Sequence, residues 1–118
     1  MVQLHGHEDQ CYISDLKKNI NIPIIKAVNV DNFKLYTDID YYLFDSIIAG
    51  SGQCFDWKEI PQLNIPFFLA GGIDLNNIDD ALKVDCFGLD ISSGVETNGY
   101  KDNEKIKRIV RKVKDGNR

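Results

Sequence analysis

The stretch Phe67-Phe68-Leu69-Ala70-Gly71-Gly72-Ile73-Asp74-Leu75 decides the class of fold. It starts with a short apolar run, turns at two glycines, and continues with helical spacing of apolar residues over positions 75–82. A strand that is apolar without alternation is covered on both faces, which is typical of a parallel sheet flanked by helices. Asp74 stands where it can cap the start of the helix that follows.

The same succession of strand and helix recurs along the chain. Short apolar segments that predict strands end at five positions: Leu4, Ala27, Phe44, Ala70 and Ile91. Helical spacing is found in two further groups, Cys11, Tyr12, Leu16 and Ile20, and Ile106, Ile109, Val110 and Val113, the second preceded by Asp102 as a candidate N-cap. Only short helices fit within 31–36 and 56–63, the second ending at or before Pro61. Strands and helices that alternate in this way favour parallel pairing, so we expect about five parallel β/α units in a single domain over 1–118.

The composition excludes several classes of protein. The 118 residues include 14 Lys and Arg against 18 Asp and Glu, a formal charge of −4, and 43% are hydrophobic. This balance is ordinary for a globular domain, and the lack of a basic stripe argues against nucleic acid as a partner. No apolar run is long enough to cross a membrane, and the first residues do not resemble a secretory signal. Three cysteines without paired spacing suggest neither disulfides nor a zinc site, so we expect a cytoplasmic protein with reduced thiols and no metal.

Polar residues gather where the predicted strands end. Five such positions stand at or just beyond a carboxyl end: His5, Lys26, Asp45, the pair Gly71-Gly72, and Asp90. Strand ends also become polar simply because they meet solvent. Five positions in register, with an acid, a base and a diglycine among them, instead favour a functional site, because the carboxyl ends of the strands carry the active site of barrels and line the ligand crevice of open sheets.

Phosphate is the ligand that the residue types favour most. Gly71 and Gly72 allow close approach of the backbone, and free N–H groups at a helix start attract an anion. Ser92, Ser93 and Gly94 follow the next strand and offer hydroxyl and backbone donors. Each loop alone is weak evidence, since a diglycine after a strand is more often only a turn. Two such loops on consecutive strands form the arrangement that phosphate-binding barrels use after their last two strands.

Several longer segments together resemble one enzyme family. They occur in this order: Val2-Gln3-Leu4-His5-Gly6, Ile24-Ile25-Lys26-Ala27-Val28, Leu43-Phe44-Asp45-Ser46, Gly50-Ser51-Gly52-Gln53-Cys54-Phe55-Asp56-Trp57, Phe68-Leu69-Ala70-Gly71-Gly72-Ile73, Leu89-Asp90-Ile91-Ser92-Ser93-Gly94-Val95-Glu96 and Gly99-Tyr100-Lys101-Asp102. The chain resembles phosphoribosylanthranilate isomerases of tryptophan biosynthesis over essentially its whole length. The resemblance implies a (β/α)8 barrel without metal or organic cofactor. It also implies an Amadori rearrangement of N-(5-phosphoribosyl)anthranilate to a carboxyphenylamino-deoxyribulose phosphate.

The length permits only part of such a barrel. A (β/α)8 barrel usually takes about 200–250 residues, and this chain has 118. Val2–Gly6 resembles the fourth strand of the family, so the resemblance implies strands four to eight and a partial (β/α)8 TIM barrel. Met1 is then an internal methionine of a longer protein, a misassigned start or a truncation point. Five strands leave two open edges, so we expect a homodimer or a complementary N-terminal fragment as partner, and no stable monomer.

The resemblance also implies roles for individual residues. Asp45 matches the general acid that protonates the ribose ring oxygen, and burial among Tyr42 and Phe44 would have to raise its pKa; alternatively, Asp45 caps a turn. Asp90 matches an aspartate that orients the substrate, although a hydrogen bond to the loop backbone is nearly as plausible. His5 is a substrate-binding candidate or a histidine satisfied by an internal hydrogen bond. The glycines and serines, Gly71, Gly72, Ser92, Ser93 and Gly94, match the phosphate site.

The general base of the family has no counterpart in this chain. In the family it is a cysteine of the first strand, whereas here Cys11 is predicted to face the core, Cys86 to begin the last strand, and Cys54 to lie in a loop. Buried structural thiols are therefore expected for Cys11 and Cys86. Trp57 and Phe55 are interpreted as packing residues. The loop over 49–53 departs from the usual Gly-Gly-Thr-Gly-Lys pattern, so the resemblance does not carry the contact of that lysine over to this chain.

Three functions from different classes remain open at the level of sequence. The first is the C-terminal portion of the isomerase, inactive without its missing strands. The second is a non-catalytic half-barrel that binds phosphate or assembles with another chain. The third is a neighbouring phosphate-binding barrel enzyme, such as indole-glycerol-phosphate synthase or tryptophan synthase alpha, which the segments 43–45 and 92–96 disfavour.

Overall fold

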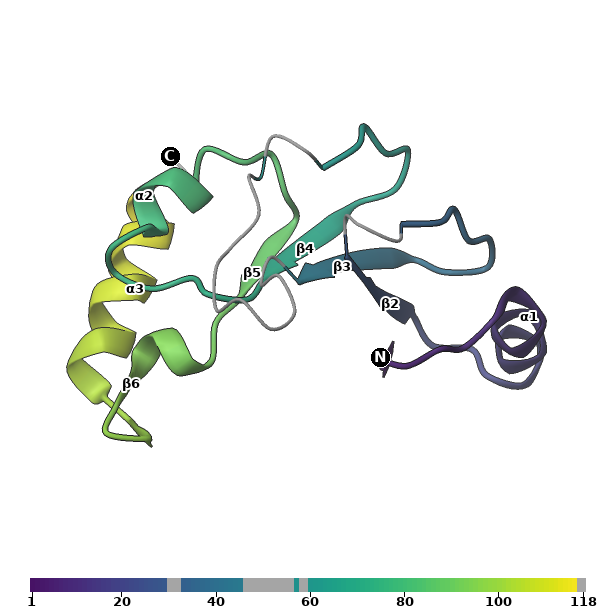
Figure 1. Ribbon diagram of the computed structural model, residues 1–118, viewed down its shortest axis with the longest axis horizontal. Coiled ribbons are helices and arrows are strands. Elements are labelled where there is room, and N and C mark those ends of the chain that lie inside the picture. The colour runs from purple at the N-terminus through teal and green to yellow at the C-terminus, as the bar shows by residue number, and fades with distance from the viewer. Residues whose placement is uncertain (30–32, 46–56, 58–59, 117–118) are drawn as a thin grey trace.

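Five parallel strands form the centre of the molecule. The computed structural model describes residues 1–29, 33–45, 57 and 60–116. The strands are β1 (Val2–Leu4), β2 (Ile24–Val28), β3 (Tyr41–Asp45), β4 (Phe67–Ala70) and β5 (Gly88–Asp90), and they pair in chain order, as Figure 1 shows. The predicted class, five parallel strands of a partial barrel, is confirmed. Each predicted strand end lies within one residue of the observed one.

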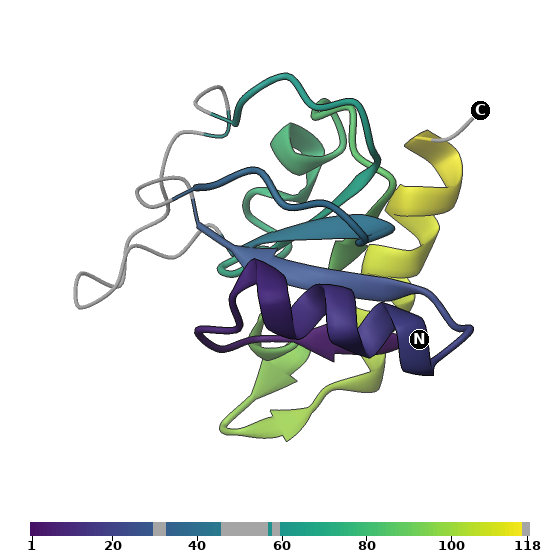
Figure 2. The ribbon, with the colours of Figure 1, turned by 90° about the vertical axis from the view of Figure 1, so that its right-hand side faces the viewer.

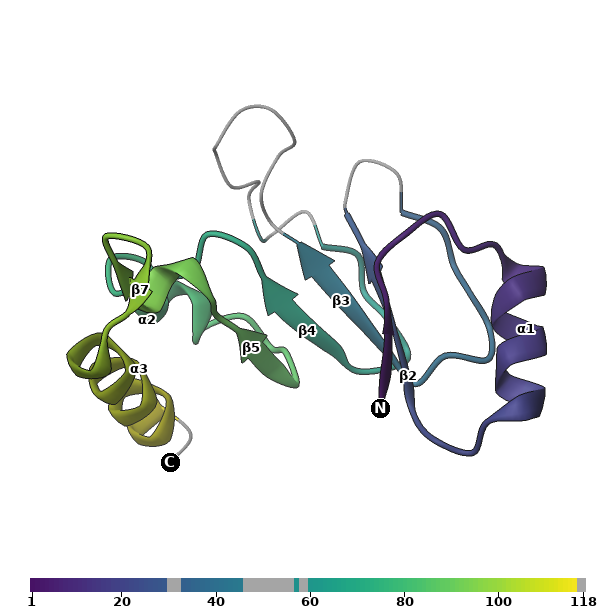
Figure 3. The ribbon, with the colours of Figure 1, turned by 90° about the horizontal axis from the view of Figure 1, so that it is seen from below.

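Helices lie at both ends of this sheet. They are α1 (Gln10–Asn19), α2 (Ile78–Ala81) and α3 (Asn103–Gly116), with a 3-10 turn over Ser93–Val95 and a small antiparallel pair, β6 (Glu96–Thr97) and β7 (Tyr100–Lys101). Figure 2 shows α1 running alongside β1 and β2. Figure 3 shows α2 and α3 at the opposite end, next to β5. The sequence did not predict the β6–β7 hairpin.

The pleat separates the side chains of the sheet into two faces. On the helix-side face, Tyr42, Phe44 and Leu69 are buried and form the main core cluster together with Ile78 and Ile109 of the helices. On the other face, here called the inner face, lies a second buried cluster composed of Ile25, Leu43 and Ala70. Successive side chains of a strand alternate between faces, so residues in one row of the register share a face. Both faces are therefore apolar, as predicted from the nearly unbroken apolar strands.

Helix α1 packs through part of the predicted stripe: Leu16 and Ile20 pack against the sheet as expected, but Ile13 takes the place of Cys11 and Tyr12. Ile13 is fully buried against Leu4 and Ile24, whereas Cys11 and Tyr12 are exposed. The Asp9 carboxylate accepts a hydrogen bond from the N–H of Tyr12 at 2.9 Å and caps the helix. The expectation that Cys11 is a buried structural thiol is wrong, because Ile13 is the residue of the first helical turns that faces the sheet, and Cys11 lies on the solvent side.

Helix α2 is shorter than predicted. It begins at Ile78, with Asn77 as its N-cap. Asp74 instead closes the turn before the helix, where its Oδ1 accepts from the N–H groups of Asn76 and Asn77 at 2.8 and 3.3 Å. The amide oxygen of Asn77 accepts in return from the N–H of Asp74 at 2.8 Å. Asp and Asn compete with the helix in this way because their short side chains hydrogen-bond to nearby backbone.

Helix α3 agrees with the prediction. The Oδ1 atom of Asp102 accepts from the N–H of Glu104 at 2.9 Å, as an N-cap does. Ile109 is buried and Ile106 and Val113 pack against the main core, while Val110 is 45% exposed. No helix is found over the described positions 33–36, and the rest of the two predicted short helices lies mostly outside the described residues.

The sheet does not close on itself. Within the described part of the chain, β1 pairs only with β2 and β5 only with β4. Both outer strands therefore present an edge, as the strand count predicted. At the amino end of the inner face, Tyr41, Phe68 and the 63% exposed Phe87 form a cluster of rings with centroids 5.0–5.3 Å apart. None of the described helices is long and apolar enough to cross a membrane.

Candidate functional site

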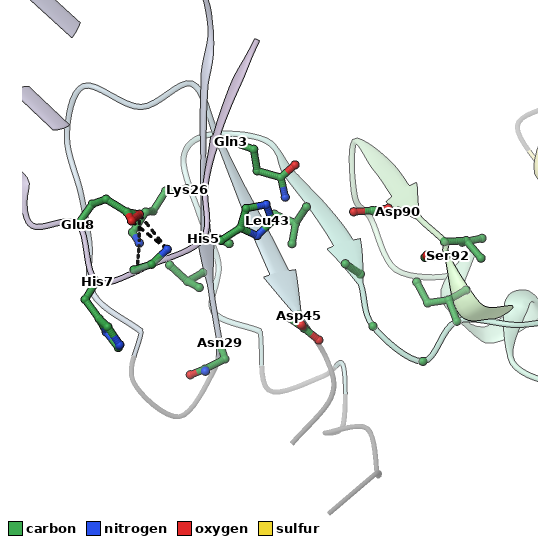
Figure 4. A pocket seen from close by; sticks show the side chains of 18 of the residues that line it. Gln3, His5, His7, Glu8, Lys26, Asn29, Leu43, Asp45, Asp90 and Ser92 are labelled. Carbon is green, nitrogen blue, oxygen red and sulfur yellow. Dashed lines mark hydrogen bonds and ion pairs between the residues drawn. The ribbon is translucent and has the colours of Figure 1, made fainter. Parts of the chain in front are cut away.

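An open cavity of about 870 Å³ lies at the carboxyl ends of the five strands. All eight residues predicted for the site line it: His5, Asp45, Gly71, Gly72, Asp90, Ser92, Ser93 and Gly94. They come from β1, β3, β4 and β5 and from the segments that follow these strands. Figure 4 shows His5, Asp45, Asp90 and Ser92 around this space. Parallel pairing thus brings together residues that are far apart in sequence.

The two candidate acids occupy one row of the sheet. Asp45 pairs with Ala70 in the register, and Ala70 pairs with Asp90. The carboxylates therefore belong to the same inner face, with one strand between them, a spacing of about 9–10 Å between backbones. A ring-sized molecule fits between two groups separated in this way.

Asp45 is exposed, and Tyr42 and Phe44 do not bury it as expected. Asp45 is the last residue of β3, and its neighbour Phe44 is fully buried in the core on the opposite face. Alternation along the strand sends the two side chains to opposite sides, so aromatic residues adjacent in sequence cannot desolvate this carboxyl. Asp90 is exposed as well.

His5 follows β1 and continues its inner-facing positions. Gln3, two residues earlier, pairs with Ile25 of the inner face and also lines the cavity. Figure 4 shows the side chains of Gln3 and His5 next to each other. Among the described residues no hydrogen bond satisfies the imidazole of His5, so the alternative of an internally bonded histidine gains no support. Gln3 is a cavity residue that the sequence prediction missed, although a polar residue between Val2 and Leu4 signals an inner-facing position.

Lys26 was predicted at a strand end and lies instead within β2. Its side chain is 3% exposed, and its Nζ donates to the carbonyl of Gly6 at 2.8 Å. The Glu8 carboxylate lies 3.4 Å from the ammonium, and the Tyr36 ring centroid lies 5.6 Å away. The side chain of Lys26 lies on the same face of β2 as Ile24 and Val28, which is the face opposite the inner face. Its ammonium therefore contacts the loop after β1 and does not enter the centre of the cavity. It holds the loop that starts at His5.

Glu8 completes this arrangement. Its two carboxylate oxygens accept from the N–H of Gly6 at 3.0 and 2.9 Å. Burial alone would raise the pKa of Glu8, but the Gly6 hydrogen bond and the nearby Lys26 ammonium outweigh it and hold the pKa below its ordinary value. Glu8 and Lys26 are 18 positions apart in sequence, so no local sequence pattern predicts this ion pair.

The two glycines after β4 adopt backbone conformations that favour glycine. Gly71 has φ +84° and Gly72 has φ +70°, both in the left-handed region. The carbonyl of Gly72 accepts from the side-chain amide of Asn77 at 2.7 Å. This contact ties the turn to the start of α2 and fixes the backbone that lines the cavity.

The loop after β5 packs directly onto the loop after β4. A Cβ atom on Gly94 would lie 1.8 Å from the carbonyl oxygen of Ile73, so only glycine fits there. The 3-10 turn uses the N–H groups of Val95 and Glu96 in its own hydrogen bonds, which leaves those of Ser93 and Gly94 outside it. Free N–H groups at the start of a turn are suited to an anion. The two predicted loops therefore form one corner, consisting of Gly71, Gly72 and Ser92–Gly94, which is here called the phosphate corner after the ligand predicted for it.

The described cysteines lie outside the cavity. Cys11 belongs to the exposed side of α1, and Cys86 precedes β5 at the amino end of the strand. Burial, the largest influence, raises the pKa of the Cys86 thiol, which makes it a weak nucleophile and fits its prediction as a structural residue. Cys54, Phe55 and the loop over 49–53 lie outside the described residues, and Trp57 packs against the main core as predicted. No group of three or more His, Cys, Asp or Glu within the described ranges is arranged to hold a metal ion.

Comparison with known proteins gives a consistent result. The sequence profile described as N-(5'-phosphoribosyl)anthranilate (PRA) isomerase matches residues 1–112. The chain is 44% identical to the N-(5'-phosphoribosyl)anthranilate isomerase of Streptococcus mutans, covering 97% of this chain and 60% of that protein. It is 46% identical to that of Endomicrobium trichonymphae, covering 94% and 59%. The chain thus spans about 60% of the length of the curated relatives it matches.

Solved structures of similar proteins share the fold. The phosphoribosyl anthranilate isomerase of Thermus thermophilus superimposes with a TM-score of 0.75 at 27% identity, covering 96% of this chain and 60% of that one. A phosphoribosyl anthranilate isomerase in complex with reduced 1-(o-carboxyphenylamino)-1-deoxyribulose 5-phosphate superimposes with a TM-score of 0.65 at 27% identity, covering 97% and 59%. With the profile matched over 112 of its residues, the chain belongs to the PRA isomerase family.

Proposed function

We propose that this chain forms strands four to eight of a phosphoribosylanthranilate isomerase. The reaction is the Amadori rearrangement of N-(5-phosphoribosyl)anthranilate to 1-(2-carboxyphenylamino)-1-deoxyribulose 5-phosphate, a step of tryptophan biosynthesis. The observation that carries the proposal is the convergence of all eight predicted site residues on one cavity at the carboxyl ends of the strands. In barrels that end of the sheet is where catalysis takes place.

The phosphate of the substrate would bind at the phosphate corner. The N–H groups of Ser93 and Gly94 and the hydroxyls of Ser92 and Ser93 are donors for its oxygens, and no basic side chain is needed. This corner lies at the ends of β4 and β5, one to two strand spacings from Asp45 on β3, about 5–10 Å. A ribose phosphate spans such a distance, so its ring can reach Asp45 while its phosphate is held.

Asp45 and Asp90 would then act on the sugar and the amine. Asp45, in its protonated form, donates a proton to the ribose ring oxygen, and the bond between C1 and that oxygen breaks as the nitrogen lone pair forms an iminium. Loss of the C2 proton to a base gives an enolamine, which becomes the ketone product. Asp90, which shares a register row with Asp45, would orient the substrate, and His5, which follows β1, would contact it from the opposite side.

The base for the second step would come from outside this cavity. Neither Cys11 nor Cys86 lines it. The open edges of β1 and β5 offer a route by which a further three strands could complete the barrel and supply the missing thiol. A complementary N-terminal fragment would supply both the strands and the thiol, whereas a second copy of the chain would only cover the open edges. General acids and bases each contribute about 10²–10⁴-fold, so we expect negligible turnover from the chain alone.

The test is complementation. The purified chain is mixed with a polypeptide that comprises the 40% of the Streptococcus mutans relative that this chain does not cover, which under this proposal is the segment before strand four. Turnover is followed by the fluorescence of the anthranilate group. We expect turnover in the mixture and its loss in the Asp45→Asn variant by about 10²–10⁴-fold. Asp85→Asn, an exposed aspartate before β5, is the matched control and should change little.

A second candidate function is a non-catalytic half-barrel that binds phosphate while assembled with another chain. The observation that favours it is the pair of open strand edges combined with the phosphate corner. Binding of inorganic phosphate by the mixture without turnover of the substrate would support this second function over the isomerase. Turnover near that of a full-length isomerase by the chain alone would contradict the role assigned to the missing strands.

A further inference from the structure

The hairpin of β6 and β7 is an addition to the plain succession of strand and helix. Its turn is Asn98-Gly99, with φ +54° and +83°, the conformation of a tight two-residue hairpin. In the pairing, Glu96 faces Lys101 and Thr97 faces Tyr100. The chain after β5 therefore leaves the sheet, reverses, and returns Lys101 to the residues that directly follow β5.

Lys101 contacts both ends of the 3-10 turn. Its Nζ donates to the carbonyl oxygen of Ser92 at 3.1 Å and lies 3.2 Å from the Ser92 hydroxyl oxygen. The same ammonium lies 2.6 Å from Oε2 of Glu96. Ser92 directly precedes the turn over Ser93–Val95, and Glu96 directly follows it. A single ammonium thus joins the residues on both sides of the turn.

Three other contacts hold the same turn from the side of α3 and β4. The N–H of Asp102 donates to the carbonyl of Val95 at 2.7 Å, and Nζ of Lys105 donates to the carbonyl of Glu96 at 2.7 Å. Gly94 packs against the carbonyl of Ile73. These contacts fix the end of the turn and its middle. At its beginning, the Ser92 carbonyl accepts from the N–H of Val95 within the turn and from Lys101 outside it.

We propose that Lys101 is a positioning residue of the phosphate corner. It holds Ser92 so that the hydroxyl and the N–H groups of Ser93 and Gly94 point to one place. Its charge is balanced by Glu96 at 2.6 Å, so it acts through geometry rather than as a free cation for the anion. This inference rests on the proposed function, since it takes phosphate as the group bound at that corner.

The experiment compares three lysine variants in the complemented barrel. Lys101→Met removes the ammonium, Lys101→Arg restores a donor, and Lys112→Met is the matched control, because Lys112 pairs with Asp79 at 3.2 Å and does not line the cavity. The readouts are the Kd for inorganic phosphate by calorimetry, and the KM and kcat for the substrate. With Lys101→Met we expect Kd and KM to rise about tenfold, the equivalent of one lost hydrogen bond, and kcat to stay within about twofold.

The outcomes separate this inference from the proposed function. Lys101→Arg should recover part of the loss, and Lys112→Met should match the wild type. An unchanged Kd in Lys101→Met, or a fall in kcat at constant KM, overturns the positioning role. If the wild type binds phosphate without turnover, the proposed isomerase function is refuted. The positioning role of Lys101 is then decided by the Kd for phosphate alone. Absence of phosphate binding by the wild type refutes both. If Lys101→Met does not fold, Lys101→Gln, which keeps a polar side chain but removes the ammonium, must raise Kd or the inference fails.

Discussion

Replacement of Gly94 by alanine tests how the two loops of the phosphate corner are joined. The added Cβ would lie 1.8 Å from the carbonyl oxygen of Ile73, 2.9 Å from its carbon and 3.0 Å from Cα of Asp74. All three atoms belong to backbone, so no side chain can rotate away. The Ile73 oxygen must retreat to beyond 3.0 Å, the limit of real contacts, and this movement separates the loops after β4 and β5. Overpacking of this kind costs about 3 kcal/mol.

The assay is urea unfolding of the complemented barrel, with the KM for the substrate measured on the same samples. Gly99→Ala is the matched control: Gly99 has φ +83°, but nothing lies within 4 Å of its added Cβ. That variant should lose only about 1 kcal/mol, the cost of a left-handed alanine. Gly94→Ala should lose more than Gly99→Ala and raise KM as well. Equal losses of stability in the two variants, or an unchanged KM in Gly94→Ala, would refute the reasoning.

Three further results are expected. Gly72→Asp places a like charge and a side chain at the phosphate corner, so the KM of the complemented enzyme should rise; an unchanged KM would count against the corner as the phosphate site. Glu8→Gln should be less stable than the wild type at neutral pH. The pKa of Glu8 is lower in the folded protein than its ordinary value of 4.5, so its carboxylate stabilises the fold above pH 4.5 and this stabilisation is lost as the pH falls through the lowered pKa. If the urea midpoints of variant and wild type stay equally far apart down to pH 2, this reasoning is contradicted. The chain alone should dimerise through its open edges or bind a hydrophobic dye on its apolar inner face. A monomer at micromolar concentration in sedimentation that melts cooperatively and binds no dye would contradict this.

The strands and the positions of the candidate site residues were predictable because their signals are local. Apolar runs bounded by turn residues define each strand. Parallel pairing then places the residues at the predicted strand ends Leu4, Phe44, Ala70 and Ile91 at one edge of the sheet without further information. The observed strand ends, such as Asp45 for Phe44, differ by a single residue. The site residues followed because they were selected for standing at those ends.

What the sequence could not supply depends on contacts between distant segments. Cys11, Tyr12 and Ile13 are all apolar positions of one helix, and only the place of β1 and β2 decides that Ile13 faces the core. The pair of Lys26 and Glu8 spans 18 positions and becomes visible only after the strand and loop are assembled. The β6–β7 hairpin, by contrast, could have been predicted from the sequence, because Asn98-Gly99 is a strong local signal for a two-residue hairpin turn.

The in-order pairing of the five strands also sets an order in time. Each strand pairs with the one synthesised just before it, through a connection of modest length, so each can join an existing edge as the polypeptide emerges. The loop that carries His5 and the end of β3 with Asp45 are then in place early. The phosphate corner needs Gly94 seated on Ile73 and Lys101 returned to Ser92, contacts from the last quarter of the chain. Translation that stops between Asp90 and Lys101 would therefore leave a chain that contains both acids but lacks the lysine that holds Ser92.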